Sequence, residues 1–330
     1  MLQEDKMKDQ RFILTGGTSF IGQHLVQRLL EDGKSIILFV RDPSKIPHDW
    51  RGNLEVVEGD IREKNSLSKL PFEGSTLFHL AGEIKRKSLF HDINVDGTKN
   101  LMDLAAYAGT KHFIHLSSVG VFGYPKQTLI DENAACHPVN EYEESKYEGE
   151  RILGEYYERH SIPITILRPS TVFGEGSNSE SFLGWMRSIK NRTFRFIGGK
   201  AYANYVYVGD VVEALVSVSK AGRSGKEDFI VSDTKTMREF VRYAAEILGA
   251  DVPDYSIPRW LAILSAEAIT PMAKVFGKRF PLTVSRVKAL TDRRIFSSEK
   301  IKKELGFQPK FGVMKGLQRT LMWYQREGLL

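Results

Sequence analysis

Tyr142 and Lys146 lie four residues apart in "NEYEESKYEGERIL", a stretch with the pattern of a helix. Residues at this spacing share one helix face, about one turn or roughly 5.4 Å apart. An ammonium group beside a phenol favours the phenolate, so it lowers the tyrosine pKa from about 10 toward neutral pH. Such a tyrosine can exchange a proton with a substrate oxygen while a hydride is transferred. Ser118, at the end of the preceding apolar run, would donate a hydrogen bond to the same oxygen.

The Tyr-x-x-x-Lys spacing also occurs at Tyr107 and Lys111. This second copy contains Gly109, which is expected to end a helix, so its two side chains need not share a face. Only the Tyr142 copy follows a strand end that carries a serine. The alternative interpretation of the Tyr142 copy is a surface tyrosine stacked on the stem of a lysine.

A glycine-rich turn lies in "RFILTGGTSFIGQHL", residues 11–25, where an apolar run stops and an amphipathic pattern begins at Phe20. In such a turn the backbone N–H groups approach a diphosphate, and the helix N-terminus adds partial positive charge. The turn has the form TGxxGxxG, except that Ser19 occupies the middle glycine position. Ser19 either shifts the phosphates slightly or donates its hydroxyl to them. The turn predicts a dinucleotide site that includes Gly16, Thr18, Ser19, Phe20, Ile21 and Gly22.

The end of the second apolar run distinguishes the two nicotinamide dinucleotides. An acidic residue there holds the ribose 2′-OH of NAD, whereas an arginine suits the 2′-phosphate of NADP. Arg41 occupies this position with Lys45 nearby, and Asp42 has already entered the loop, so the sequence favours NADP over NAD. The alternative is that Arg41 is a surface charge and Asp42 binds the ribose. Further along the chain, the adenine pocket and the ribose side are expected to include Asp60, Ile61, Ala81 and Gly82.

Six apolar runs and the helical patterns between them must position these residues. β-branched and aromatic residues dominate the runs, as expected for strands that are buried on both faces. The predicted strands lie in 11–16, 35–40, 54–60, 75–82, 112–119 and 164–174. Helical patterns cover Phe20–Leu30 and Thr98–Tyr107. Because parallel strands need right-handed crossovers, the chain predicts an α/β fold with a Rossmann-type doubly wound parallel sheet.

The alternation of strands and helices breaks at about residue 175. The first domain, residues 1–175, is expected to bind NAD(P), and residues 176–330 to form mainly a smaller substrate-binding lobe. A segment at about 202–220, "NYVYVGDVVEAL" within it, is expected to return to the main sheet as a strand. Helices are predicted at Thr236–Leu248 and Pro258–Ile269, and the last 25 or so residues read as a turn followed by an amphipathic helix.

Composition excludes several classes of protein. The 330 residues carry a net charge of +6, but no block of like charge exceeds 85–87, so the charges form either a solvated surface or a rim that attracts anions. Nothing gathers basic and aromatic residues as nucleic-acid binding requires. The single cysteine, Cys136, is expected to be inert and fits a reducing cytosol. No stretch reaches the ~20 apolar residues of a membrane span, and the N-terminus lacks a signal-peptide pattern, so a cytoplasmic location is expected. His112 and His115 face opposite sides of one strand, so no metal site is expected.

Taken together, the motifs resemble those of extended short-chain dehydrogenases/reductases of the NAD(P)-dependent epimerase/dehydratase type. The shared features are the turn at 15–22, "NVDGT" (94–98), "SSVGVFG" (117–123), Tyr142 with Lys146, "RPSTVFG" (168–174), "YVYVGDVVEA" (205–214) and "ELGFQP" (304–309). The resemblance implies an enzyme whose catalytic set is Ser118, Tyr142 and Lys146. It implies that Asn94 supports Lys146 through the backbone or water. It also places Ser117, Pro169, Thr171 and Val172 at the cofactor.

Three departures from the family pattern bear on the substrate. Dehydratases of this family carry an Asp-Glu pair where this chain has 119–120, Val-Gly, so dehydration is not expected. Nucleotide-sugar enzymes often carry an Arg-Asp pair where 203–204 are Ala-Asn, which removes a bidentate phosphate contact. Arg195, Lys200 or Arg238 could substitute for that arginine. The capping segments "SFLGWMRSI", "WLAILSAEAI" and "MAKVF" are apolar, which suits either a pocket for a greasy alcohol or ketone or simply the lobe's own core.

The leading hypothesis is an NADP-dependent oxidoreductase that interconverts a secondary alcohol and a ketone by hydride transfer assisted by tyrosine, lysine and serine. A nucleotide-sugar 4-epimerase with tightly bound NAD(P) uses the same residues and is the first alternative. A non-catalytic NADP-binding scaffold or sensor is the second. The expected partner is a small molecule, either a hydroxy or keto compound or a nucleotide sugar. Relatives of this type commonly form homodimers through the helices bearing Thr98 and Tyr142, and the sequence is compatible with a homodimer.

Overall fold

The computed structural model describes residues 11–222, 224–265 and 284–330, and seven of their strands form one parallel sheet. Its strand order is β12-β7-β5-β4-β1-β2-β3, with every neighbouring pair parallel. The expected doubly wound fold is confirmed. The strands are β1 (Arg11–Thr15), β2 (Ser35–Val40), β3 (Glu55–Glu58), β4 (Thr76–His79), β5 (His112–Leu116), β7 (Ile164–Pro169) and β12 (Lys226–Val231).

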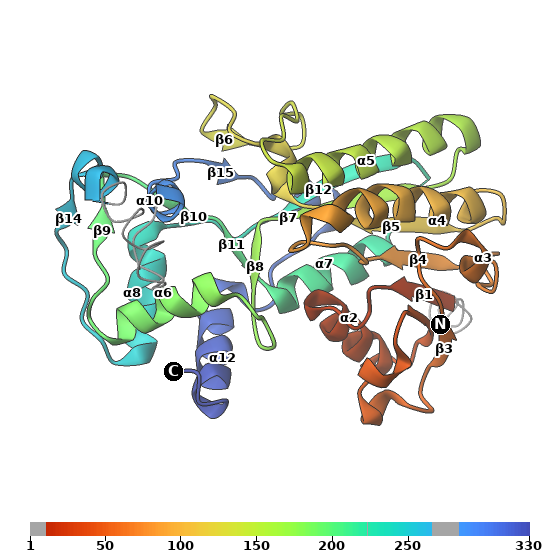
Figure 1. Ribbon diagram of the computed structural model, residues 1–330, viewed down its shortest axis with the longest axis horizontal. Coiled ribbons are helices and arrows are strands. Elements are labelled where there is room, and N and C mark those ends of the chain that lie inside the picture. The colour runs from red at the N-terminus through yellow and green to blue at the C-terminus, as the bar shows by residue number, and fades with distance from the viewer. Residues whose placement is uncertain (1–10, 223, 266–283) are drawn as a thin grey trace.

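Helices cover both faces of this sheet (Figure 1). On one face lie α2 (Phe20–Glu31) and α7 (Val208–Lys220), whose apolar residues share a core with β1, β2 and β4. On the other lie α4 (Gly97–Ala105) and α5 (Glu141–His160), which bury a second core. The strand order reverses between β1 and β4, and in doubly wound sheets such a reversal is the place where the loops at the carboxyl ends of the strands diverge.

The expected returning strand does not join the main sheet. The predicted strand 164–174 splits at Ser170 into β7 and β8 (Thr171–Phe173), and β8 pairs with β11 (Tyr205–Tyr207) in a separate two-stranded sheet. The seventh strand of the main sheet is β12, which pairs with β7. Its first three residues, Lys-Glu-Asp, hid it from a search for apolar runs. The helix that follows β11, α7, does pack back onto the sheet.

The lobe is built around α6 (Glu180–Lys190), α8 (Met237–Leu248) and α12 (Gly312–Arg326), which bury an aromatic core. The expected helix at 236–248 and the final amphipathic helix are thus confirmed. Short strand pairs complete the fold: β6 (Leu129–Ile130) with β15 (Ile295–Phe296), β9 (Phe196–Ile197) with β14 (Ser256–Ile257), and β10 (Tyr202–Ala203) with β13 (Lys235–Thr236). The remaining helical segments are α3 (Lys64–Leu67), α10 (Val284–Leu290), α11 (Glu299–Leu305), η1 (Pro43–Lys45), η2 (His48–Trp50), η3 (Lys87–Leu89), η4 (His91–Asp96, a π-helix) and η5 (Val119–Phe122).

Some predictions fall on residues outside the described ranges. Residues 259–265 are helical, but the rest of the helix predicted at Pro258–Ile269, the segment "MAKVF" and the N-terminal ten residues lie outside them. Within the described ranges, no helix has both the length and the apolar character to cross a membrane.

Candidate active site

The turn after β1 requires glycine at two positions for different reasons. Gly16 has φ +75°, and a Cβ there would lie 2.4 Å from the backbone N of Ala81, at the end of β4. A Cβ on Gly22 would lie 2.1 Å from the carbonyl oxygen of Gly16. The backbone of the turn therefore lies against the first turn of α2 and the neighbouring strand end. Side chains at Gly16 and Gly22 would occupy the space beside this turn. Their absence leaves the backbone N–H groups accessible, which fits the close approach of a diphosphate.

Ser19 acts as the N-cap of α2. Its backbone is extended, and its hydroxyl oxygen accepts a hydrogen bond from the N–H of Gly22 at 3.2 Å. A residue with φ −76° has no conformational need to be glycine. The serine thus satisfies one of the helix N–H groups that would otherwise need water or a ligand.

The loop after β2 leaves Arg41 exposed and engages Asp42 elsewhere. Asp42 accepts hydrogen bonds from the N–H of Ser44 at 3.0 Å and from its hydroxyl at 2.5 Å, and these contacts lower the pKa of Asp42. Lys45 lies 3.7 Å from the same carboxylate. Since Asp42 caps its own turn, its oxygens are already occupied on one side. Arg41 is exposed and does not cap this turn.

Asp60 and Ile61, expected at the adenine, differ in exposure. Asp60 is held by the guanidinium of Arg62, with a closest contact of 2.7 Å. Burial opposes ionisation of Asp60, but hydrogen bonds from Arg62 and the charges of Arg62 and Arg41 lower its pKa overall. The side chain of Ile61 is buried in the core beneath α4, where a Cβ on Gly97 would lie 2.6 Å from it.

The three predicted catalytic residues come from two adjoining elements. Ser118 follows β5 and caps η5 by accepting a hydrogen bond from the N–H of Gly120 at 3.1 Å. Tyr142 lies in the first turn of α5, where its ring packs edge-on against Phe90 with 5.7 Å between centroids. Lys146 lies one turn later and is buried. Tyr142 and Lys146 both lie in the first two turns of α5. Because α5 packs against η5, this part of the helix lies near the turn that contains Ser118.

The ammonium of Lys146 is directed at strand β5. Its Nζ donates to the carbonyl of Leu116 at 2.8 Å and lies 3.2 Å from Nε2 of His115, and no hydrogen bond joins it to Tyr142 among the described residues. Burial lowers the pKa of Lys146 to about 8. Burial, followed by the charge of Glu143, raises the pKa of Tyr142 to about 12. The expected lowering of the Tyr142 pKa is therefore wrong for this structure, since burial and the charge of Glu143 both raise it.

Asn94, expected to support Lys146, contacts the residue beside it. Its amide accepts from the N–H of Glu83 at 2.8 Å and donates to the Glu83 carbonyl at 3.1 Å and to Ser145 Oγ at 2.9 Å. Ser145 in turn donates to the carbonyl of Tyr142. Asn94 therefore fixes the first turn of α5 to the loop that follows β4.

Sequence reasoning missed Glu83, His79 and His115. The carboxylate of Glu83 accepts three successive backbone N–H groups of residues 84–86 and so closes the loop beside the site. His79 and His115 lie directly opposite each other on β4 and β5. Both occur in a His-Leu pair followed by small residues at a strand end, "HLAG" and "HLSS", and this repeated pattern was the available signal.

The remaining expected cofactor residues lie along the carboxyl ends of the strands. Ser117 is buried at the end of β5, and neither its Oγ nor that of Ser170 has a hydrogen-bond partner among the described residues. Pro169 ends β7, whereas Thr171 and Val172 lie in β8. Unpartnered buried hydroxyls at this edge fit a polar ligand that would satisfy them. Ala81 lies against Gly16, and Gly82 is exposed beside Asn94.

A cavity of about 710 Å³ extends from β8 into the lobe. Of the three cations that could replace the missing arginine, only Arg195 lines it. Lys200 is not among the lining residues, and Arg238 lies over the ring of Phe196, 4.5 Å from its centroid. Two cations that were not expected, Lys288 and Arg294, line the cavity as well.

Arg294 connects the lobe to the turn that follows Ser118. Its guanidinium donates to the carbonyl of Gly123, pairs with Asp292 at 2.6 Å and lies 4.5 Å from the ring centroid of Tyr124. Tyr124 lines the same cavity. A planar guanidinium suits such combined pairing and stacking better than an ammonium does.

The apolar segment on α6 serves both interpretations that the sequence left open. Phe182, Leu183 and Met186 are buried in the lobe's core. Trp185 lines the cavity, stacks on Phe240 with 5.1 Å between centroids, and has a buried indole N–H without a partner among the described residues. In the second apolar segment, Trp260 is 64% exposed, so it is not a core residue.

Two other predictions concern isolated residues. Tyr107 is exposed and packs on His160 at the end of α5. This position agrees with the prediction that the second Tyr-x-x-x-Lys copy is not part of the site. Burial raises the pKa of the Cys136 thiol to about 11, which agrees with an inert cysteine.

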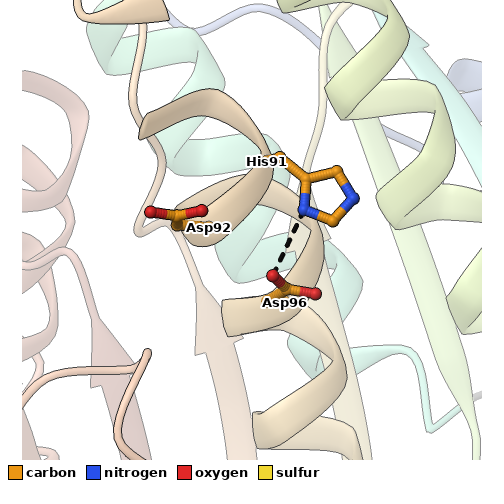
Figure 2. Close-up of side chains that lie close together, drawn as sticks. All are labelled: His91, Asp92 and Asp96. Carbon is orange, nitrogen blue, oxygen red and sulfur yellow. Dashed lines mark hydrogen bonds and ion pairs between the residues drawn. The ribbon is translucent and has the colours of Figure 1, made fainter. Parts of the chain in front are cut away.

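One group of potential metal ligands was not expected from the sequence. Figure 2 shows His91, Asp92 and Asp96 on η4, with ligand atoms within 4.8 Å of one another. All three are exposed, and His91 Nδ1 lies 3.2 Å from Asp96 as an ordinary surface pair. Nothing beyond this proximity indicates a metal, and the expectation of no metal site stays a prediction.

Comparisons with known proteins place the chain among enzymes. Residues 12–232 match the model of the NAD dependent epimerase/dehydratase family. An N-acetyl-alpha-D-glucosaminyl-diphospho-ditrans,octacis-undecaprenol 4-epimerase of Escherichia coli O157:H7 is 27% identical, with 94% of each chain covered. A 3beta-hydroxysteroid-dehydrogenase/decarboxylase (isoform 1) of Arabidopsis thaliana is 28% identical over 97% of this chain and 81% of that protein. The crystal structure of UDP-glucuronic acid 4-epimerase from Bacillus cereus in complex with NAD has the same fold, with a TM-score of 0.73 at 18% identity over 96% of this chain and 99% of that one.

Proposed function

This chain belongs to the NAD dependent epimerase/dehydratase family of extended short-chain dehydrogenases/reductases, and we propose that it is a 4-epimerase of a sugar attached to a diphosphate. The proposal reverses the order of the two leading sequence hypotheses. It is supported by the names of similar proteins, which include a 4-epimerase of a sugar linked to a polyprenyl diphosphate. It is also supported by the lining of the large cavity.

The cavity carries the proposal because it combines cations with aromatic rings. Arg195, Lys288 and Arg294 line it, and Arg195 has no carboxylate partner among the described residues. The indole N–H of Trp185 is buried and has no hydrogen-bond acceptor among the described residues. A volume of about 710 Å³ suits a large ligand better than a small ketone. A diphosphate would supply anionic oxygens to Arg195 and Lys288 and an acceptor to the Trp185 N–H, whereas Arg294 is already paired with Asp292.

The chemistry needs one residue to move a proton and others to stabilise charge. A dinucleotide held by the glycine-rich turn of Gly16 and Gly22 would supply reversible hydride transfer at the sugar carbon. Tyr142 takes the hydroxyl proton as the sugar is oxidised and gives it back on reduction. Lys146 stabilises the phenolate by its charge, and Ser118 donates to the reacting oxygen. The reaction is an isomerisation with no net redox change, and 119–120, Val-Gly, offer no acid to remove water.

The test is turnover on a panel of UDP-hexoses, UDP-N-acetylhexosamines and polyprenyl-diphosphate N-acetylhexosamines, with the sugars separated by chromatography. We expect conversion of a sugar to its 4-epimer without change in NADPH absorbance. Tyr142→Phe is expected to lower kcat at least ~10²-fold, because it removes the proton-transferring group. The proposal would be overturned if none of these donors were converted to its 4-epimer. Full activity of Tyr142→Phe would show that Tyr142 does not transfer the proton, and absence of turnover on every sugar and ketone would favour the non-catalytic scaffold.

An alcohol–ketone oxidoreductase remains the second candidate. The similar hydroxysteroid dehydrogenase favours it, as do the exposed apolar side chains of Trp260 and Leu264 on the lobe. Such an enzyme would consume NADPH with a hydrophobic ketone and would leave sugars unchanged. Both assays use the same preparation, so the outcomes separate the two candidates.

We further propose that NADP is preferred over NAD. Asp42 caps its own turn, which leaves the exposed Arg41 as the charge nearest the expected 2′-phosphate. Arg41→Ala is expected to weaken NADPH binding about tenfold or more and to change NADH binding little. Arg51→Ala, at another exposed position, is the control. Equal dissociation constants of the two dinucleotides in the unchanged protein would contradict the preference.

A further inference from the structure

His115 is a buried imidazole that the proposed reaction has not used. It is 1% exposed and is the next-to-last residue of β5, two residues before Ser117. Its Nε2 lies 3.2 Å from Nζ of Lys146, while its Nδ1 has no hydrogen-bond partner among the described residues. A buried polar atom without a partner costs free energy, so the residue has a reason to be there other than its own stability.

The neighbouring histidine shows that this contact is specific to His115. The hydroxyl of Thr98 donates to the carbonyl of Asn94 at 2.7 Å, so it can only accept from Nε2 of His79 at 3.0 Å. The Nδ1 of His79 then accepts from Thr15 at 2.7 Å, and both of its ring nitrogens are satisfied. His79 is therefore a structural histidine, and its ring lies 5.1 Å from that of His115.

Burial is the main determinant of the protonation state of His115. Burial, followed by the electrostatic effects of Lys146 from α5, His79 from β4 and Arg168 from β7, holds the pKa of His115 well below its usual range. The ring is thus neutral. Because the ammonium of Lys146 has only protons to give, Nε2 must be the accepting nitrogen, and the ring proton lies on the unpartnered Nδ1.

We propose that His115 is a positioning residue for Lys146: its Nε2 and the carbonyl of Leu116 hold the ammonium between them, so that the lysine stays charged and fixed at the end of β5, beside the turn that carries Ser118. Glu150, one turn further along α5, contributes only a more distant charge to Lys146. The two acceptors at 2.8 and 3.2 Å are the close contacts that burial requires for a charged amine. This inference rests on the proposed catalytic role of Lys146.

The sign of the expected effect follows from the direction of the hydrogen bond. An acceptor stabilises the charged amine, so removal of the imidazole lowers the Lys146 pKa further. The alkaline loss of activity that accompanies deprotonation of Lys146 then moves to lower pH. A residue that merely fills space would leave this titration unchanged.

The experiment compares His115→Leu with His112→Leu. His112 lies on the same strand, is 4% exposed and hydrogen-bonds to Thr165 at 2.9 Å, so it controls for the loss of a buried histidine. Lys146 is titrated by NMR in protein labelled with ¹⁵N-lysine and without substrate, and its signal is identified by its absence in Lys146→Met. In His115→Leu the midpoint is expected to fall by about one pH unit. In His112→Leu it is expected to stay at the wild-type value.

Kinetics provide the second readout. His115→Leu is expected to lower kcat about tenfold with little change in KM, and to move the alkaline limb of the pH profile in the same direction as the NMR midpoint. His115→Gln places an amide oxygen near the position of Nε2 and is expected to restore most of both properties, whereas the shorter His115→Asn is not. The Gln and Asn pair also decides the question if His115→Leu fails to fold.

An unchanged Lys146 midpoint in His115→Leu, or equal shifts in His112→Leu, would overturn the proposal. The titration needs no substrate, so it reports on this contact even if no sugar is epimerised. Failure of the proposed function would appear instead as absent turnover in the unchanged protein.

Discussion

Burial sets the charges of the side chains at the centre of the site. Lys146 is 5% exposed and Tyr142 is mostly enclosed, and the low polarity around both disfavours their charged forms. The pKa of the lysine falls to about 8 and that of the tyrosine rises to about 12. At neutral pH these values leave the lysine mostly charged and the phenol neutral. The residues around them therefore decide how readily the phenolate forms.

Glu143 is the neighbour whose charge opposes that ionisation. It follows Tyr142 on α5, and its charge contributes to the raised pKa of the phenol. Glu143→Gln removes this charge but keeps an oxygen that can accept from the N–H of Val139, as Glu143 does at 2.9 Å. We expect the Tyr142 pKa to fall below about 12 in this variant. The measurement is the phenolate absorbance against pH, with the Tyr142→Phe counterpart of each protein subtracted.

The exposed neighbour Glu144 provides the matched control for that substitution. Glu144→Gln removes one negative charge from the same helix turn, but water screens it. We expect little change in the Tyr142 titration. A midpoint that is unchanged in Glu143→Gln, or equally lowered in both variants, would show that Glu143 does not govern the phenol.

Lys146 links the charge of the site to the stability of the protein. Its pKa is about 8 in the folded protein and about 10.5 in an exposed lysine, so between these values the unfolded chain binds more protons. This group therefore favours the folded state increasingly as pH rises through that window. In Lys146→Met the contribution is absent. We expect the unfolding free energy of the wild type, measured relative to this variant by urea titration, to increase from pH 8 to pH 10.

Lys99, exposed on α4, gives the control for this comparison. Its side chain stays in water before and after unfolding, so Lys99→Met is expected to follow the wild type across the same pH range. If the difference in unfolding free energy between wild type and Lys146→Met stays constant from pH 8 to pH 10, the pKa of Lys146 is not lowered in the folded protein.

At this scale the sequence predicts residue types better than contacts. The four-residue spacing places Tyr142 and Lys146 on one helix face, because helix periodicity alone fixes that relation. The partner of the ammonium depends on a tertiary contact, and periodicity does not reveal that His115 lies below α5. The same holds for Glu83, whose carboxylate closes a loop that no local pattern defines.

Helix α5 is the element that carries the site, and its two glycines have opposite environments. A Cβ on Gly149 would lie 2.8 Å from the carbonyl oxygen of Asn94, so this glycine lets α5 pack closely on η4. A Cβ on Gly154 would meet nothing closer than the end of Lys226, at 3.8 Å. Alanine gains about 1 kcal/mol over glycine within a helix, unless it collides with a neighbour.

We therefore expect Gly154→Ala to stabilise the protein by up to about 1 kcal/mol. Gly149→Ala is expected to destabilise it by about 1–3 kcal/mol, because the backbone in contact cannot move like a side chain. It also displaces Asn94 from Ser145, so kcat should fall. Thermal unfolding and kinetics of the two variants test the contrast. Equal stabilisation by both would mean that α5 and η4 are not closely packed there.

The elements of the first half follow from local sequence, and those of the second half do so less completely. Five of the six predicted strands fall in place. In β1, β2, β4 and β5 the β-branched and aromatic residues fill strands that are largely buried, whereas the edge strand β3 is mostly exposed. The sixth prediction missed the break at Ser170, where the chain leaves the main sheet for β8. Strand β12 was missed because an edge strand needs apolar residues only where it meets the core, here at 229–231.

At the scale of the whole molecule, two short strand pairs join the sheet domain to the lobe. β8 pairs with β11, and β6 with β15, so segments far apart in the sequence lie side by side (Figure 1). The division into an NAD(P)-binding domain and a substrate lobe remains a prediction. The cavity nevertheless has residues from both parts, including Thr171 and Trp185. The shape of the cavity therefore depends on how firmly the two parts are held.

Arg294 is the residue that holds them beside the cavity, immediately before β15. It contacts Asp292 in the lobe and both the Gly123 carbonyl and the Tyr124 ring in the turn after Ser118. Arg294→Ala would release that turn and leave Asp292 without its partner, at a cost of about 1–3 kcal/mol. We expect a lower unfolding free energy and a KM about tenfold higher, with a smaller effect on kcat, since the proposed function uses the cavity for substrate binding and not for proton transfer. Arg242→Ala, which breaks an exposed pair with Asp254, is the control and should change either quantity little. If KM stays unchanged while stability falls, the contact joins the two parts without shaping the substrate site.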